Sequence, residues 1–356
     1  MTPTVDVLVP VHSVHRPVAR LARSVLQTSV PIRLVVVAHN VDPSQIEAAL
    51  GEHRADPRVS VLAFEDGIPS PAGPLRHALE RLESPFFMKI DSDDYLADGA
   101  IESWTRTQRA HDADIVIPTM RMVGTPRNFP TPPRRPFRTR LDPARDRLAY
   151  RTSTMGLIRS ELAEKAIPTP GLGTAEDLIP GLRLWFSGGR IVAADARHPY
   201  MVAPDALDRV TEVAWPMEQE LGFAAALPGE SFWAGLDDAA RIGIAAKLFR
   251  VQLVAALGRE ARSRLTAEDI RVARDAVRVF EELAPGFARV LSRDDARLLA
   301  ELVSADADPV ALADLARRSR AHLSVGGLLT PRLGDVLRRD APLRYLGASV
   351  LARYRR

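Results

Sequence analysis

Short β-branched runs alternate with helical segments over the first 118 residues of the 356-residue chain, and this alternation restricts the fold more than any other feature. The pattern predicts strands at 5–10, 32–37, 59–64, 86–90 and 114–118, and helices at 17–27, 44–50, 75–82 and 101–110. Strands separated by helices at such spacing pair in parallel through right-handed crossovers. We therefore expect an α/β fold in which a mostly parallel sheet is flanked by helices.

The sequence changes character after about residue 216, where strand runs disappear and alanine, leucine and arginine recur at helical spacing. Helices are expected near 232–259, 267–283, 293–303 and 309–322. Thr266 and Ser292 are each followed three residues later by an aspartate, which is typical of a helix N-terminus. The chain is too long for one ordinary core, so we expect an α/β domain over 1–215 and an all-α C-terminal domain over 216–356.

The composition excludes several kinds of site. The chain contains no cysteine, which rules out disulfides, thiolate zinc sites, iron–sulfur clusters and a cysteine nucleophile. Its net charge is only +3 and no base-reading motif accompanies it, so we expect no nucleic-acid partner. The N-terminus lacks the pattern of a signal peptide, and no apolar run has the length of about 20 residues that spans a bilayer. We therefore expect a cytoplasmic protein.

An acidic cluster, Asp91-Ser92-Asp93-Asp94, follows the strand expected at 86–90. Asp91 and Asp93 are two residues apart as that strand ends, so their side chains point to the same side. Ligands of parallel sheets bind outside the carboxyl ends of the strands, and two carboxylates there suit Mg²⁺ or Mn²⁺. An acidic triplet alone is more often a solvated turn, but the buried strand in front of this one favours a metal site.

A second acidic pair, Glu176-Asp177, follows a glycine-containing loop and begins a segment of helical spacing. A carboxylate at this place can act as general base on an acceptor hydroxyl if the fold brings it near the first cluster. The alternative is a carboxylate that caps the N-terminus of the helix that follows.

Four stretches together resemble the family-2 glycosyltransferases, which are inverting enzymes with the glycosyltransferase-A fold. They are 7–12 (Val-Leu-Val-Pro-Val-His), Arg76-His77, 89–94 with its Asp-Ser-Asp-Asp, and Glu176-Asp177 with the Gly188-Gly189 that follows. The resemblance covers about residues 4–212. It implies a nucleotide-binding sheet of the glycosyltransferase-A type, a divalent metal (Mn²⁺ or Mg²⁺) and a nucleotide-sugar donor, with a UDP-sugar favoured.

The resemblance also implies roles for the acidic residues. Asp93 would be the principal metal ligand, Asp91 would lie near the ribose or the metal, and Asp94 would support the site. Asp177 would be the general base, with Glu176 beside it at the acceptor.

The donor-binding residues implied by the resemblance are less complete. Family members carry aspartates at the end of the second strand, where this chain has Val37-Ala38-His39-Asn40. His39 or Asn40 can still hydrogen-bond a nucleoside. The residues expected to bind the donor are Pro10, His12, Asn40, Arg76, Asp91 and Arg209.

The function implied by the resemblance is the synthesis of a surface glycan or glycoconjugate on a glycan or lipid-linked acceptor. The alternative is a non-catalytic relative that binds a nucleotide sugar weakly and organises partners through its helical domain. The basic and apolar tail over 342–356 leaves peripheral contact with the inner face of a membrane open, and a homo-oligomer is open as well.

Overall fold

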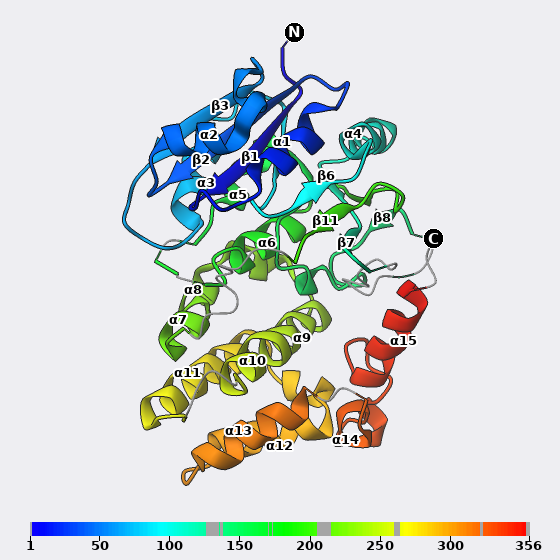
Figure 1. The fold of residues 1–356 in the computed structure, drawn as a ribbon. Helices are drawn as coiled ribbons and strands as arrows, with labels where there is room; N and C mark the ends of the chain where they lie inside the picture. The colour runs from blue at the N-terminus through cyan, green and yellow to red at the C-terminus, as the bar shows by residue number, and fades with distance from the viewer. Residues whose placement is uncertain are drawn as a thin grey trace.

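The computed structural model describes residues 2–125, 135, 138–169, 171–172, 174–204, 215–259, 264–320 and 323–353. Figure 1 shows an α/β part, coloured blue to green, and a helical part, coloured yellow to red, with helix α6 (Leu178–Trp185) between them. Among the described residues, no helix is both long enough and apolar enough to cross a bilayer.

The central sheet contains eight strands in the order β3-β2-β1-β4-β9-β6-β10-β8. Strands β3, β2, β1 and β4 pair in parallel, and β9 runs antiparallel to both β4 and β6. The strands are β1 (Val5–Val11), β2 (Ile32–His39), β3 (Val59–Phe64), β4 (Phe86–Lys89), β6 (Ile115–Ile117), β8 (Arg140–Leu141), β9 (Leu157–Arg159) and β10 (Ile191–Ala193). This arrangement confirms the predicted α/β class.

Helices cover both faces of the sheet because its central strands are apolar on both sides. In β1, Val5, Val7, Val9 and Val11 pack on one face, and Leu8 packs on the other. The first face is covered by α1 (Val18–Leu26), α2 (Pro43–Leu50) and α4 (Ala100–His111). The second face is covered by α3 (Ala72–Leu79), α5 (Ala163–Ala166) and the C-terminal half of α6.

A second, smaller sheet lies beside the acidic segment. It has the order β5-β11-β7 and consists of β5 (Tyr95–Leu96), β7 (Met120–Met122) and β11 (Tyr200–Val202). β5 comes directly after Asp94, so its pairing with β11 fixes the end of the acidic cluster and sets Tyr200 beside it. None of the strands β7 to β11 was predicted, because runs of two or three residues carry no readable period.

The helical part follows the predicted pattern closely. The capping boxes at Thr266 and Ser292 are both formed, with Asp269 and Asp295 as the reciprocal acids. The single helix expected near 232–259 is divided by a π-helical turn over Leu248–Leu253. The helices are α7 (Met217–Leu221), α8 (Phe223–Ala226), α9 (Asp238–Lys247), α10 (Val254–Leu257), α11 (Ala267–Leu283), α12 (Arg293–Val303), α13 (Pro309–Ser319), α14 (Val325–Leu328) and α15 (Pro342–Arg353).

The two parts of the molecule share one apolar cluster. Leu178, Ile179 and Leu182 of α6 are buried together with residues of α9, including Ile244 and Ala245. The N-terminal half of α6 therefore packs into the helical part, while its C-terminal half packs on the sheet.

A buried carboxylate ties together the amino ends of β1 and β2. Asp6 has no exposed surface and accepts hydrogen bonds from Arg33 Nε (3.1 Å) and Nη2 (2.8 Å). It also accepts from the Ser84 hydroxyl (2.6 Å) and the Glu83 backbone N–H (2.7 Å). Burial alone raises the pKa of Asp6, but these hydrogen bonds outweigh it and lower the pKa below its ordinary value.

Replacing this carboxylate should destabilise the fold. Asp6→Ala leaves Arg33 and the Ser84 hydroxyl without their acceptor, so we expect a loss of about 3 kcal/mol in the free energy of unfolding, measured with urea at pH 7. Because the folded pKa of Asp6 is lowered, its contribution is present above the unfolded value of 3.8 and is lost as the pH falls further. The control Glu80→Ala breaks an exposed pair with Arg76 and should change stability by less than about 0.5 kcal/mol. Equal losses in the two variants would contradict the role of Asp6.

Candidate active site

The carboxyl ends of β1, β2 and β4 lie side by side at one edge of the sheet. Pro10 pairs in register with Val37, and Leu8 pairs with Lys89. Continuing the second register by two residues sets Asp91 level with Pro10. The structure therefore brings the predicted residues of all three strand ends to the same edge, where ligands of parallel sheets bind.

Asp91 is held on two sides but keeps an open face. Its Oδ1 lies 3.0 Å from the Lys89 ammonium, and its backbone N–H donates to Tyr200 Oη over 3.0 Å. The side chain is 38% exposed, which leaves it accessible to a ligand. Tyr200 is buried, so the small sheet supplies a fixed support for the start of the acidic cluster.

Asp93 is anchored to the segment that follows β1. Its Oδ2 forms an ion pair with Arg16 Nη1 (3.1 Å), and its carbonyl oxygen accepts from Arg20 Nη2 (2.6 Å). Arg16 in turn lies 3.4 Å from His12 Nε2, so that His12 and Asp93 share a neighbour. Neither arginine was predicted; their spacing of four residues just after the first strand is the signal that could have indicated them.

Asp94 is buried and holds the acidic segment 91–94 against the residue that follows β11. Its Oδ1 accepts from the backbone N–H of Ala203 (2.9 Å), directly after β11. Burial, together with the charge of Asp91, raises the pKa of Asp94 to about 7. This position agrees with the supporting role that the resemblance implied.

Asp177 occupies the N-cap position of α6, but its side chain makes no capping hydrogen bond. The backbone before it is strained, because Ala175 adopts a φ of +59°, a region that residues with a Cβ rarely occupy. The Thr169 backbone N–H fixes the same loop by donating to the carbonyl of Glu176 (3.1 Å). The Asp177 carboxylate is therefore positioned without being used as a cap.

The Lys89 ammonium connects the two acidic groups. Burial lowers the pKa of Lys89, but Asp91, Asp177 and Glu176 outweigh it and raise the pKa above its ordinary value. Burial raises the pKa of Glu176 to about 7, with Asp177 adding to the shift, and burial also raises the pKa of Asp177. Asp91 and the adjacent pair Glu176-Asp177, which are far apart in the sequence, thus interact with the same buried positive charge.

A carboxylate that the sequence analysis missed lies at the end of β2. Asp66, from the loop after β3, lies 2.8 Å from His39 Nε2, and its backbone N–H donates to Asn40 Oδ1 (3.0 Å). Gly73 permits this approach, since a Cβ there would lie 2.4 Å from Asp66 Oδ2. Like Asp91, Asp66 follows a predicted strand, and this shared position could have indicated it.

The donor-binding roles expected of Arg76 and Arg209 remain predictions. Arg76 lies on the exposed face of α3, where its Nε pairs with Glu80 (2.9 Å). Arg209 lies outside the described residues. His12 is exposed beside Asp93's partner Arg16, and Pro10 lies at the end of β1.

The residues present suit a divalent metal only as a partial donor set. Asp91 and Asp93 offer hard carboxylate oxygens at an accessible edge, which is the chemistry that Mg²⁺ and Mn²⁺ prefer. Each also pairs with a cation, Lys89 or Arg16. Within the described ranges, no three acidic or histidine side chains converge as a complete metal site. A bound metal would therefore need further oxygens from a diphosphate or from water.

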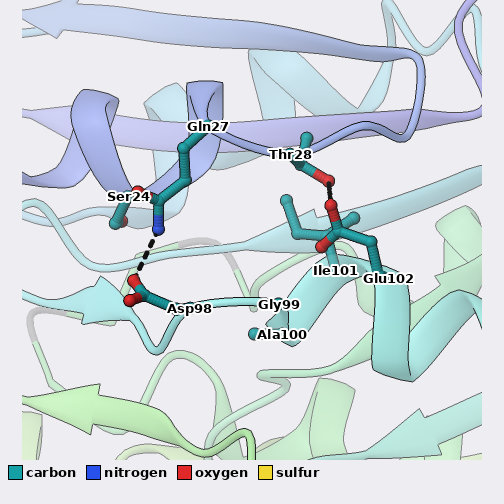
Figure 2. Close-up of a pocket in the computed structure, with 8 residues that line it drawn as sticks. All are labelled: Ser24, Gln27, Thr28, Asp98, Gly99, Ala100, Ile101 and Glu102. Atoms are coloured by element: carbon teal, nitrogen blue, oxygen red, sulfur yellow. Dashed lines mark hydrogen bonds between the residues drawn. The ribbon is translucent and has the colours of Figure 1, made fainter.

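Two cavities lie outside the acidic edge. Figure 2 shows one of about 220 Å³ between α1 and the start of α4, where Gln27 donates to Asp98 (2.7 Å) and Thr28 to Glu102 (2.7 Å). The other cavity, of about 410 Å³, lies at the amino end of β6. Arg190 lines it and donates a hydrogen bond to the backbone carbonyl of His111, at the end of α4. Neither cavity is lined by any of the predicted site residues.

The comparisons with known proteins concern the family and the fold of the chain. Residues 6–166 match the sequence model of glycosyl transferase family 2. The resemblance to the family-2 glycosyltransferases inferred from the motifs is confirmed over this range. The match ends before Glu176, so the roles of Glu176 and Asp177 remain predictions. A comparison with curated proteins found no match.

Solved structures resemble the whole fold. The structure of residues 1–349 of S. aureus TarS in complex with UDP-GlcNAc is 17% identical, covers 90% of this chain and 91% of its own, and gives a TM-score of 0.68. The same protein in complex with UDP gives a TM-score of 0.66 at 17% identity, with 90% and 92% of the two chains covered. In the structure of TarS without that truncation, 55% of the chain is covered, with 89% of this one, 17% identity and a TM-score of 0.68. At this identity the likeness establishes the shared fold.

Removing the central positive charge should destabilise the site. Lys89→Met leaves three carboxylates facing one another, so we expect a loss of about 3 kcal/mol in the free energy of unfolding at pH 8, measured with urea. The loss should be smaller at pH 5. The folded pKa of Glu176, about 7, lies above its unfolded value of 4.5, so the stability this group contributes is present at low pH and lost as the pH rises through 7. The control Lys165→Met alters an exposed lysine and should leave both values unchanged. A loss that does not depend on pH would contradict this arrangement.

Proposed function

We propose that this chain transfers a sugar from a nucleotide-sugar donor to a hydroxyl acceptor in a single inverting displacement. Asp91 would act on the donor side of the reaction and Asp177 on the acceptor side. The observation that carries the proposal is the position of the buried Lys89 ammonium, which lies 3.0 Å from Asp91 Oδ1 and whose pKa is raised by the charges of Asp91, Asp177 and Glu176. A candidate metal ligand and a candidate base are thereby proposed to share one edge of the sheet.

The donor is proposed to lie across the ends of β1, β2 and β4. Asp91 and Asp93 would hold a Mn²⁺ or Mg²⁺ ion, which stabilises the negative charge of the departing diphosphate. The strand ends at Pro10, His12 and Asn40 would contact the nucleoside. A uridine donor is supported by the shared fold with TarS, whose structures contain UDP-GlcNAc or UDP.

The transfer step is proposed to need only one base. Asp177 takes the proton of the acceptor hydroxyl as its oxygen bonds to the anomeric carbon. The bond from that carbon to the diphosphate oxygen breaks at the same time, and the nucleoside diphosphate leaves with the electron pair. Because the Asp177 carboxylate is not used to cap α6, it is available for this proton transfer.

The acceptor is proposed to be a glycan or a lipid-linked hydroxyl compound. Helix α15 exposes Leu343, Val350 and Leu351, which supports peripheral contact with a membrane that carries such an acceptor.

Donor binding can be tested without knowing the acceptor. We expect a nucleoside diphosphate to raise the melting temperature of the wild type in the presence of Mn²⁺, because a ligand that binds only the folded state stabilises it. Asp93→Ala should abolish the Mn²⁺-dependent part of this shift. Asp98→Asn, which alters a carboxylate in the neighbouring cavity, should retain it. A shift that is the same in Asp93→Ala and the wild type would contradict the metal assignment. No shift with any nucleotide would favour the non-catalytic alternative.

The base can be tested separately from donor binding. Asp177→Asn should keep the nucleotide-dependent shift but lower kcat by about 10³-fold, because it removes the proton acceptor. In the wild type, kcat/KM should fall as the pH drops through the raised pKa of Asp177, since only the ionised carboxylate accepts a proton. Full transfer activity in Asp177→Asn would exclude this residue as the base.

A further inference from the structure

Lys247 is a buried lysine that the proposed reaction does not yet explain. It is the last residue of α9, its side chain is 1% exposed, and its Nζ has no hydrogen-bond partner among the described residues. An ammonium group in such surroundings is costly unless an opposite charge compensates for it. Packing alone therefore does not explain a lysine at this position.

The choice of lysine is itself informative. The chain has 48 basic residues, and only three of them are lysines: Lys89, Lys165 and Lys247. Lys165 is exposed, whereas the other two are buried and both act on Asp177. Lysine carries a compact charge that can be buried and whose pKa responds to its surroundings, unlike that of arginine.

The charge that acts on Lys247 is the candidate base. Burial lowers the pKa of Lys247 to about 7, and the negative charge of Asp177 opposes this shift. On the carboxyl, burial raises the pKa of Asp177, Lys89 and Lys247 lower it, and Asp91 raises it. Glu176 lies next to Asp177 in the chain, and the charge of Asp177 adds to the rise in the pKa of Glu176.

The other charged groups around α9 interact with different partners. Arg250, in the turn after Lys247, lies 3.5 Å from Asp295 and 3.3 Å from Tyr150 Oη. Asp340, which packs on Gly243 of α9, lies 3.4 Å from Arg147. Two further arginines in the packed elements are also engaged: Arg289 pairs with Asp335, and Arg274 of α11 donates to backbone carbonyls.

The backbone around Lys247 is also irregular. The α-helical pattern ends at Lys247, and the next six residues, Leu248–Leu253, form a π-helical turn. Such turns are rare and occur frequently at functional sites. Ala246 and Leu248, on either side of Lys247, belong to the same buried apolar cluster as Leu178, which directly follows Asp177.

We propose that Lys247 is a positioning residue of the transfer reaction: its ammonium, supplied by the helical part of the molecule, keeps the carboxylate of Asp177 ionised. This inference rests on the proposed role of Asp177 as the base. It gives the helical part a direct chemical role, since Asp177 then lies between Lys89 from the sheet and Lys247 from α9.

The first test is a pH–rate profile of Lys247→Met, which keeps the length of the side chain and removes its charge. Without this ammonium, Asp177 should take up a proton more readily, so the acid limb of kcat/KM should move up by about one pH unit. At pH values below the limb, kcat/KM should therefore fall by about tenfold. The control Arg241→Met, on the same helix, removes donors to the carbonyls of Trp233 and Leu236 and should leave the limb in place. An unchanged limb in active Lys247→Met overturns the proposal.

The second test does not depend on activity and separates this inference from the proposed function. Melting temperatures are measured for the wild type, Lys247→Met, Asp177→Asn and the double variant. With Asp177 intact, losing the ammonium should lower the melting temperature by about 5 °C; in the Asp177→Asn background, the same change should raise it, because the unpaired charge is removed. A single variant that fails to fold while the double variant folds also supports the pairing. Equal effects in both backgrounds, or failure of both variants to fold, overturn it.

If the charges prove to be coupled but the wild type transfers no sugar, the pairing holds. In that case the proposed function is wrong, and the pairing of Lys247 with Asp177 has no role in catalysis.

Discussion

The buried charge of Lys89 is the constraint on which the site depends. Three carboxylates cannot lie together in a protein interior without a compensating positive charge, because their repulsion adds to the cost of burial. Lys89 lies at the end of β4 and acts on Asp91, Glu176 and Asp177 at once. The candidate metal ligand Asp91 and the candidate base Asp177, which the sequence separates by more than eighty residues, both interact with this one side chain.

The helical part contributes to the same site through α6. This helix packs its N-terminal half in the core of the helical part and its C-terminal half under the sheet. Asp177, at the start of α6, is therefore positioned by both parts of the molecule. The buried Lys247 adds a charge from α9 to this position. If Asp177 is the base, as proposed, both parts of the molecule contribute to the transfer reaction.

Much of the fold could be predicted, because its elements have local signals. The helices 267–283 and 293–303 begin and end where the pattern placed them, since each starts with a capping box. The strands of the sheet's parallel half are mostly apolar runs of four to eight residues. The strands β7 to β11 could not be predicted, because their two or three residues are stabilised only by pairing with segments distant in the chain.

The site residues also divide into those with a local sequence signal and those without one. Asp91, Asp93 and Asp94 stand at a strand end that periodicity reveals, and Glu176 and Asp177 were indicated by a motif. Asp66 follows β3 in the same way that Asp91 follows β4, and the rule that found one could have found the other. Lys247 carries no local signal, because its meaning comes from the packing of α9 against α6.

The central claim is that a nucleotide and its metal bind at the edge formed by β1 and β4. Anomalous diffraction from crystals soaked with Mn²⁺ and a nucleoside diphosphate tests it most directly. We predict a manganese peak beside Asp91 and Asp93, with the diphosphate on its open side and the nucleoside toward Asn40. A nucleotide bound in either of the two cavities outside this edge, or a manganese peak away from both aspartates, would contradict the assignment.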